Sequence, residues 1–526
     1  MGTDAMTTIA WMVALVLVTI TVTALSRRVG WSAPIVLVAA GAAVSFIPFV
    51  PVVEVQPDLI LYGLLPPLLF AAAYRTSLID VRARRDPILL LSVGLVAFTV
   101  VVVGVVTWAV VPGLGLAAAL AFGAVVAPTD AVAVTAMTRR ARMPRVLTTL
   151  LDGESLLNDA TSLVALNAAI AAIVSIINPW AIAGDFALAV IGGVAVGLAV
   201  GFTLGEVRRR LGSPVLDTCL SFVTPYLAFL LATLLHGSGF LAVVVAGLLL
   251  GYRAPSISSA AARVATQLNW RTIQFLLENT VFVLIGLSLP GIVRGAIHSG
   301  IGVWQTVLIC VVVLATLFVS RLVWSVVVTA VYRWGPQRLR RSSWPFNQNI
   351  PISLAGVRGV VTLAAVFLLP EQTPHREFLQ LLAVVVVVGT LLQSLLLPWV
   401  IRHLTLPRPN LDQEHIEAQL LLAEAQAAGL AALEAAETDA VDDRVIARLR
   451  TNATFLSESL DVAANEPDAE SLHASYARLR RVTIVAERAA VLRARAEGRY
   501  QELAVRTALE IIDAEETALR AAETDD

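Results

Sequence analysis

The sequence predicts an all-α polytopic membrane protein with about 13 transmembrane helices and a cytoplasmic helical C-terminal tail. The first observation behind this fold class is composition, because 57% of the 526 residues are hydrophobic and only 15% are charged. The mean hydropathy of +0.79 lies outside the range of soluble globular domains. The second is a series of apolar runs long enough to cross a bilayer, and the third is the alternation of arginine between the connecting loops.

The apolar runs give the candidate spans in chain order. Most hold about 20 residues, the length that a helix needs to cross the hydrocarbon core. The first run has no basic residue before it and no clear cleavage site, so we expect a retained helix there. The spans are expected at residues 6–25, 34–50, 58–75, 87–111, 115–136, 147–175, 183–205, 214–235, 238–251, 272–290, 301–332, 350–370 and 378–400.

Arginine marks every second loop, whereas the loops between offer only Arg294 and Arg376. By the positive-inside rule the arginine-rich loops are cytoplasmic, which places the N-terminus outside and the C-terminus inside a cell (inner) membrane. The arginine-rich loops hold Arg27 and Arg28; Arg75, Arg82, Arg84 and Arg85; Arg139, Arg140, Arg142 and Arg145; Arg208 to Arg210; Arg253, Arg263 and Arg271; Arg333, Arg338, Arg340 and Arg341; Arg402 and Arg408.

The charge balance divides the chain into two domains with different solvents. Residues 1–410 contain 26 Arg and 15 acidic residues, whereas residues 411–526 contain 12 Arg and 24 acidic residues. We therefore expect a transmembrane domain over 1–408 and an acidic cytoplasmic domain over 409–526, built from two or three amphipathic helices. This tail could pair with itself, cap the membrane domain or bind a regulator; a solvated helical appendage is the simpler interpretation.

Acidic residues interrupt the apolar pattern at 151–162, which reads Leu-Asp-Gly-Glu-Ser-Leu-Leu-Asn-Asp-Ala-Thr-Ser. An ionised carboxylate at the bilayer centre costs roughly 2.5–3.5 kcal/mol on insertion scales, so an acid there indicates a functional site. Ser155 and Asp159 are four residues apart, and Asn158 is three residues from Ser155. Helical spacing places these side chains along one face.

Two spans contain helix-breaking sequences. Pro128-Thr129-Asp130 divides the span at 115–136, and residues 349–353 and 356–359 break up the span at 350–370. Discontinuous helices at membrane depth occur where protein or a water-filled cavity surrounds them. In transporters such breaks commonly form the substrate site. The sequence therefore predicts that polar residues from the interrupted spans meet.

Together these residues supply hard oxygen donors without a neighbouring His or Cys ligand, a set that suits a small monovalent cation rather than a transition metal. A proton and a cation would compete for the same carboxylate oxygens. Competition of this kind is sufficient for antiport, if the site changes sides only when loaded. No covalent chemistry, cofactor or nucleic-acid surface is indicated, so the sequence predicts a transporter rather than an enzyme.

Charged residues elsewhere in the spans need partners. Arg358 in the broken span is expected to pair with Glu154, which lies on a different face of its helix from Asp159. Arg321 is expected to reach the cytoplasmic surface by extending its side chain. Glu278 and Asn279 could line a pore or form hydrogen bonds between helices, and the sequence leaves both possibilities open.

Four motifs in order along the chain resemble those of sodium/proton exchangers in the first monovalent cation:proton antiporter branch. They are Leu65–Phe70 (Leu-Pro-Pro-Leu-Leu-Phe), Ala127–Ala131 (Ala-Pro-Thr-Asp-Ala), Gly153–Asp159 (Gly-Glu-Ser-Leu-Leu-Asn-Asp) and Gly356–Gly359 (Gly-Val-Arg-Gly). The resemblance covers about residues 10–405. It implies an inverted-repeat antiporter architecture with two crossing, partly unwound helices. It also implies a homodimer in which a dimerisation domain holds a core domain that moves like an elevator.

The resemblance further implies roles for single residues. Asp159 would be the shared cation and proton carrier, and Glu154 with Arg358 would form a structural ion pair. An Asn before this Asp is similar to the electroneutral, one-for-one exchangers, with Na⁺ as the first candidate ion and Li⁺ or K⁺ as alternatives. The Na⁺ ligands would be Asp159, Asp130, Ser155 and Thr129, with Asn158 as the neighbouring amide.

One position departs from the family pattern. Many members place an acid directly after the segment that matches Leu65–Phe70, whereas this chain has Ala71, Ala72 and Ala73. A carboxylate at the edge of the site is missing. Ion affinity and the choice of Na⁺ over K⁺ are therefore left open.

Two other functions could use the same residues. A cation channel gated by the cytoplasmic tail would also need acids along an aqueous path, but the sequence has no repeated filter segment. A membrane sensor with a vestigial transport body would not need the complete set of polar residues. Exchange of a monovalent cation for a proton is the function that the sequence predicts.

Overall fold

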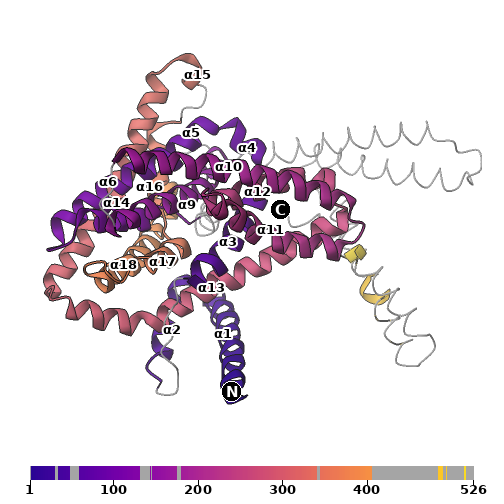
Figure 1. The fold of residues 1–526 in the computed structure, drawn as a ribbon, viewed down its shortest axis with the longest axis horizontal. Coiled ribbons are helices and arrows are strands. Elements are labelled where there is room, and N and C mark those ends of the chain that lie inside the picture. Colours follow the sequence, from indigo (N-terminus) through magenta and orange to yellow (C-terminus); the bar gives the residue numbers. More distant parts are fainter. Residues whose placement is uncertain are drawn as a thin grey trace, which may run out of the picture. The chain divides into compact units, whose positions relative to one another are not determined.

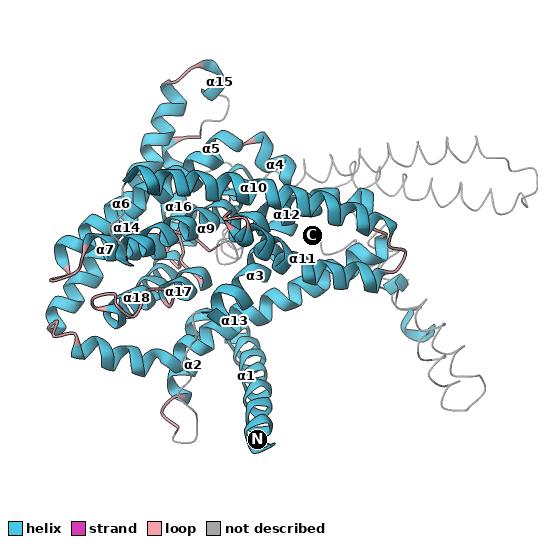
Figure 2. Ribbon diagram, viewed as in Figure 1, coloured by secondary structure: helices cyan, strands magenta, loops and turns pink. Residues whose placement is uncertain are grey.

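The computed structural model describes residues 2–29, 33–47, 58–130, 143, 145–174, 179–340 and 344–404, together with 484–487, 489, 493 and 514–516 of the tail. These residues form helices and loops, and no strand occurs among them (Figure 2). The predicted all-α class is confirmed. The tail helices expected over 409–526 lie almost entirely outside the described residues, so that domain stays a prediction.

Figure 1 shows the helices of the described residues. In chain order they are α1 (Gly2–Val29), α2 (Ala33–Val44), η1 (Leu59–Leu64), α3 (Leu65–Arg75), α4 (Leu78–Ala83), α5 (Arg85–Leu89), η2 (Leu90–Gly94), α6 (Leu95–Val110), α7 (Leu116–Val126), α9 (Arg145–Val174), α10 (Pro179–Arg210), α11 (Pro214–Leu234), α12 (Gly239–Ile257), α13 (Ala260–His298), α14 (Val303–Trp334), α15 (Gln337–Arg340), η3 (Phe346–Gln348), α16 (Asn349–Leu354), α17 (Val360–Val366), α18 (Arg376–Ser394) and α19 (Leu397–His403).

Within the described residues, each predicted span overlaps one helix or consecutive helices, and residues 131–136 of the span at 115–136 lie outside them. In the described part of the chain, eight helical segments are long and apolar enough to cross a membrane: Arg85–Val110, Leu147–Ile173, Phe186–Arg210, Pro214–Leu234, Gly239–Ile257, Ala261–His298, Val303–Trp334 and Arg376–His403. Ala10–Ser26, Ala33–Val44 and Leu116–Val126 are shorter apolar helices. The protein is therefore a multi-pass membrane protein, while the count of about 13 crossings stays a prediction.

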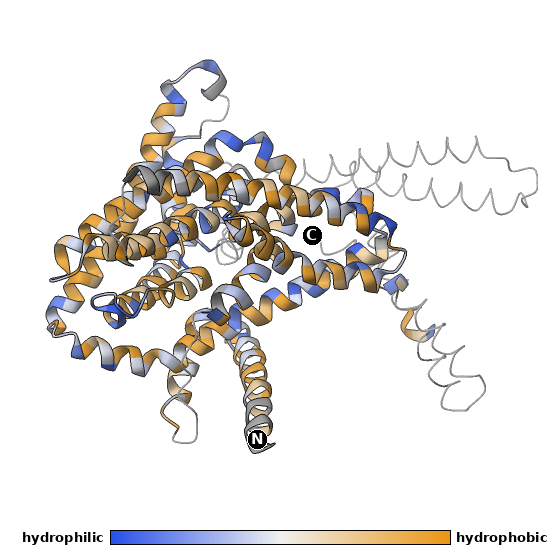
Figure 3. Ribbon diagram, in the orientation of Figure 1, coloured by the Kyte–Doolittle hydropathy of each residue, from blue (hydrophilic) through white to orange (hydrophobic). Residues whose placement is uncertain are grey.

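Hydrophobic residues make up most of these helices (Figure 3), and many of them are exposed while others are buried between helices. On α14, Trp304 is 87% exposed and Leu308 is 62% exposed, whereas Val313 and Leu317 on the same helix are buried. A soluble protein would not leave such a surface open to water, but lipid tails can contact it. The same helix thus packs against protein on one side and against the bilayer on the other.

Helix α2 crosses α13 at a close contact between glycines. A Cβ atom added to Gly286 would lie 2.3 Å from the carbonyl oxygen of Val38, and one added to Gly41 would lie 2.4 Å from that of Val283. Both backbones therefore approach too closely for any side chain. Small residues at such crossings allow close packing of helices within a membrane.

The two segments that the sequence predicts to be broken are both interrupted. Helix α7 ends at Val126, two residues before Pro128, and residues 127–130 are not helical. Helix α16 ends at Leu354, and residues 356–359 are not helical before α17 begins at Val360. The backbone N–H of Asp130 donates to the carbonyl oxygen of Val357 at 2.8 Å, so the two breaks contact each other directly. Residues 131–142, which follow the first break, lie outside the described residues.

We expect Gly286→Leu to destabilise the protein, because overpacking a tight contact costs about 1–3 kcal/mol. The matched control is Gly291→Leu on the same helix, where an added Cβ would meet no atom within 4 Å. The melting temperature of the purified protein in detergent measures both. Equal melting temperatures for the two variants would show that the α2–α13 crossing tolerates a side chain.

Candidate functional site

A small cavity of about 50 Å³ lies where the two breaks meet. Its wall comes from five parts of the chain: α3, residues 128–130, α9, α13 and the segment leading into α17. The lining is part apolar and part polar. The lining residues are Leu68, Leu69, Ala72, Pro128, Thr129, Asp130, Asp159, Gln274, Glu278, Gly359, Val360, Val361 and Thr362.

Two carboxylates of the predicted site, Asp159 and Asp130, line this cavity, and both are half-buried. Asp159 belongs to α9, which continues after it as a largely apolar helix. Asp130 is held by its backbone bond to Val357. A Cβ atom on Gly359 would overlap the carboxylate of Asp130, so glycine is required there for the two breaks to cross.

Thr129 connects these acids to a buried polar network on α9. Its hydroxyl oxygen accepts a hydrogen bond from the side-chain amide of Asn158 at 2.7 Å. The same oxygen lies 3.4 Å from the hydroxyl of Ser155 and 3.4 Å from a carboxylate oxygen of Glu154. Ser155 and Asn158 are each 1% exposed and are not part of the cavity wall. They support Thr129 from behind, while Thr129 itself faces the cavity.

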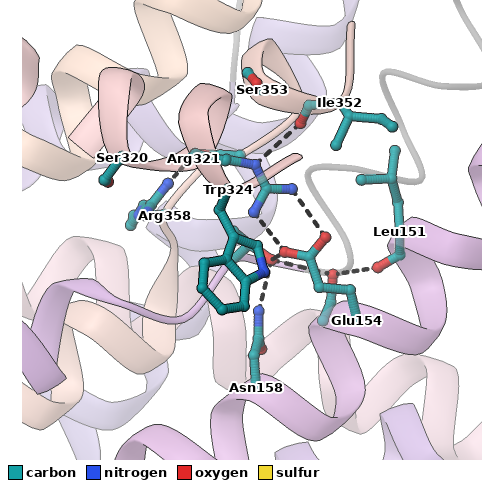
Figure 4. Close-up of polar contacts among 12 residues, drawn as sticks. Leu151, Glu154, Asn158, Ser320, Arg321, Trp324, Ile352, Ser353 and Arg358 are labelled. Atoms are coloured by element: carbon teal, nitrogen blue, oxygen red, sulfur yellow. Dashed lines mark hydrogen bonds and ion pairs between the residues drawn. The ribbon is translucent and has the colours of Figure 1, made fainter. Parts of the chain in front are cut away.

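Glu154 forms an ion pair with Arg321 of α14 (Figure 4). The predicted pairing of Glu154 with Arg358 is therefore wrong. Both terminal nitrogens of Arg321 contact the carboxylate, one of them at 3.0 Å, and its Nε donates to the carbonyl oxygen of Ile352 at 3.0 Å. Arg321 is 2% exposed, so the expectation that it reaches the cytoplasmic surface is also wrong. This two-point contact joins α9 to α14 and to the broken helix α16.

Arg358 instead binds backbone carbonyl groups at the two breaks. Its Nε donates to Val126 at 2.8 Å, and one terminal nitrogen donates to Gly356. The last carbonyls of a helix have no partner within the helix and bear partial negative charge. A guanidinium group can satisfy several carbonyls at once, so the carbonyl at the end of α7 and the Gly356 carbonyl in the second break take the place of the predicted acidic partner.

Helix α13 contributes two polar residues to the opposite wall. Glu278 lines the cavity, which decides between the two interpretations that the sequence leaves open for it. Asn279 donates within its own helix to Phe275 at 2.7 Å and does not line the cavity. Gln274, which the sequence analysis does not identify, lies one turn before Glu278. Its signal in the sequence was its i,i+4 spacing with Glu278, which places both polar side chains on one face of the helix.

Comparisons with known proteins agree with this geometry. The family model described as "Sodium/hydrogen exchanger, transmembrane" matches residues 13–403. This chain belongs to the sodium/hydrogen exchanger family. Its members are transporters and not enzymes, as the sequence predicts.

Two relatives and one solved structure illustrate the similarity. An uncharacterized Na⁺/H⁺ exchanger of Mycobacterium tuberculosis is 33% identical over 433 residues, which cover 80% of this chain and 79% of the relative. A sodium, potassium, lithium and rubidium/H⁺ antiporter of Bacillus subtilis is 32% identical over 407 residues, which cover 72% of this chain and 59% of the relative. The solved structure of the sodium proton antiporter MjNhaP1 of Methanocaldococcus jannaschii has a TM-score of 0.62 at 17% identity, covering 76% of this chain and 98% of that chain.

The α3 wall of the cavity is apolar. Ala72 lines the cavity, and Ala71 and Ala73 on either side of it are buried. The α3 wall therefore contributes no charge to the cavity. Among the described residues, no three His, Cys, Asp or Glu side chains converge closely enough to hold one metal ion.

The buried ion pair gives a prediction about folding. Arg321→Gln should lower the stability of the exchanger strongly, because removing one partner of a buried pair costs about 3–5 kcal/mol. Glu154→Gln in the same protein should recover a large part of the loss, since no uncompensated charge remains. Arg333→Gln, at the exposed end of the same helix, is the control. The amount of monodisperse protein and its melting temperature are the measurements. A single variant as stable as the double variant would contradict the pairing.

Proposed function

We propose that this exchanger carries one monovalent cation and one proton in opposite directions, with Asp159 as the shared carrier. The observation that supports this best is the placement of Asp159, Asp130 and Thr129 on one cavity at the crossing of two broken helices. Carboxylate and hydroxyl oxygens are ligands that hard cations prefer. A proton on Asp159 and a cation beside it exclude each other, so the two ions take turns at the same oxygens.

The other site residues have supporting roles in this proposal. Ser155 and Asn158 orient the Thr129 hydroxyl, and they can join the cation ligands when the site rearranges around a bound ion. Asn158 is neutral, so the carrier pair exchanges one charge for one charge, and transport is electroneutral. Na⁺ is the first candidate, and Li⁺ and K⁺ are alternatives. The relative named for sodium, potassium, lithium and rubidium supports testing all of these.

The wider features of the proposal follow the family resemblance and the arginine pattern. The exchanger would work as a homodimer in which the core helices move past the dimerisation helices, carrying the site across the membrane. The N-terminus would lie outside and the C-terminus in the cytoplasm, where the acidic tail could bind a regulator.

The test of the carrier is Asp159→Asn in liposomes with a trapped pH dye. An acid-inside gradient followed by external Na⁺, Li⁺ or K⁺ should produce cation-dependent alkalinisation in the wild type, because protons leave as cations enter. The variant should show none, since its amide cannot take up a proton at neutral pH. Asp86→Asn, at an exposed carboxylate outside the cavity, is the control and should transport normally. Full activity in Asp159→Asn would disprove the carrier role.

Stoichiometry is tested by clamping the membrane potential with valinomycin and K⁺ during Na⁺ and Li⁺ transport. One-for-one exchange moves no net charge, so the initial rate should be the same at clamped potentials of either sign. A rate that changes with potential would show that the numbers of cations and protons differ.

The competition between ions predicts a pH dependence. In isotope exchange of Na⁺ at equal pH on both sides, the apparent KM for Na⁺ should rise by up to about tenfold for each unit of acidification, because protons occupy the same carboxylate. The maximal rate should change little, since enough Na⁺ displaces the proton. A fall in maximal rate at constant KM would mean that protons act at a different site.

A further inference from the structure

The α13 wall of the cavity has a feature that the proposed exchange reaction does not use. Glu278 lines the same cavity as Asp130 and Asp159 but comes from a different helix. On the neighbouring α3 wall, Ala72 leaves the position without a charge. The carboxylate of this side of the cavity is therefore supplied by α13.

A chain of hydrogen bonds fixes the position of Glu278. The side-chain amide nitrogen of Gln274 donates to its Oε1 at 2.7 Å, and the oxygen of that amide accepts from Arg75 at 3.3 Å. Because Arg75 can only donate, it fixes which end of the amide faces Glu278. Gln274 holds one oxygen of the carboxylate. In the described part of the structure, the second oxygen, Oε2, accepts no hydrogen bond.

This arrangement argues against a purely structural role. A buried acid that serves packing usually joins two helices, but the hydrogen-bond partner of Glu278 is one turn away on its own helix. No arginine among the described residues forms an ion pair with it. A half-buried carboxylate with an open oxygen costs free energy that a cation in the cavity would recover.

A second observation at this cavity also points to a ligand. Thr362 lines the cavity and is 1% exposed, and its hydroxyl has no hydrogen-bond partner within the described residues. Buried hydroxyl groups are nearly always paired. A cation, or a water molecule of its hydration shell, would satisfy this oxygen.

Glu278 does not complete the coordination shell of an ion on the two aspartates, because no three acidic side chains of the described residues converge on one point. We propose that Glu278 is a separate first station, which draws the hydrated monovalent cation to the α13 wall before the cation moves to Asp130 and Asp159. Thr362 contacts the cation or its water during this transfer. The inference rests on the proposed cation exchange, and it assigns to α13 the charge that α3 lacks.

The variant that tests this station is Glu278→Gln, which keeps the shape of the side chain and an oxygen that can accept from Gln274. We expect the apparent KM for Na⁺ to rise about tenfold, because a charged wall raises the local cation concentration by this order. The maximal rate should stay within about twofold, since Asp159 is intact. Glu278→Asp, which keeps the charge, should have a KM close to that of the wild type. Glu206→Gln, at an exposed glutamate near the end of α10, is the control.

A rescue separates charge from packing. Adding Ala72→Glu to Glu278→Gln returns a carboxylate to the cavity from α3, and it should lower the KM towards the wild-type value. A KM that is unchanged in Glu278→Gln, or equally raised in Glu278→Asp and not rescued by Ala72→Glu, would overturn the proposal.

Cation binding provides a readout independent of transport. In detergent, replacing choline chloride with NaCl at constant ionic strength should raise the melting temperature, and Glu278→Gln should shift the midpoint of this rise to higher Na⁺ concentration. If wild-type liposomes show no exchange, the proposed function fails. The melting curves then still test whether Glu278 contributes to cation binding. A midpoint identical in the wild type and Glu278→Gln would exclude it.

Discussion

The backbone of a membrane protein cannot leave its polar groups unpaired in hydrocarbon, and at the crossing of the broken segments this constraint shapes the whole site. Each break frees N–H and carbonyl groups at membrane depth. The breaks satisfy each other through the bond from Asp130 to Val357, and Arg358 takes up carbonyls at the ends of both. These freed backbone groups are paired across the crossing and not within a continuous helix, and the cavity lies at this crossing.

The ion pair between Glu154 and Arg321 stabilises the crossing of the two breaks. Arg321 contacts the carboxylate on α9 and a carbonyl of α16, so one side chain connects an intact helix to a broken one. Glu154 in turn lies within 3.4 Å of the Thr129 hydroxyl, which lines the cavity. The ion pair and the cavity therefore belong to one polar network. The ion pair is buried at one end of this network, and the two aspartates line the cavity at the other.

The sequence predicts much of this arrangement, for identifiable physical reasons. Apolar length locates the helices, Pro128 marks a break, and helical spacing places Asp159 beside its polar neighbours. Charge balance gives the wrong partner for Glu154, because it counts side chains and ignores the carbonyls that bind Arg358. The i,i+4 spacing of Gln274 and Glu278 does not by itself identify Gln274 as a cavity residue, since only tertiary packing decides which face of α13 lines the cavity. Contacts between distant helices are what a single sequence does not contain.

Helix α13 carries both the close contact with α2 and a carboxylate of the cavity wall. Gly286 lets α2 approach within the membrane, and Glu278 stands on the cavity wall eight residues earlier, roughly 12 Å along the same stiff helix. The depth of the helix contact thus sets the position of a charge at the ion path. A substitution in the α2–α13 contact that shifts α13 would therefore also shift Glu278 relative to the cavity, although the substituted residue never meets an ion.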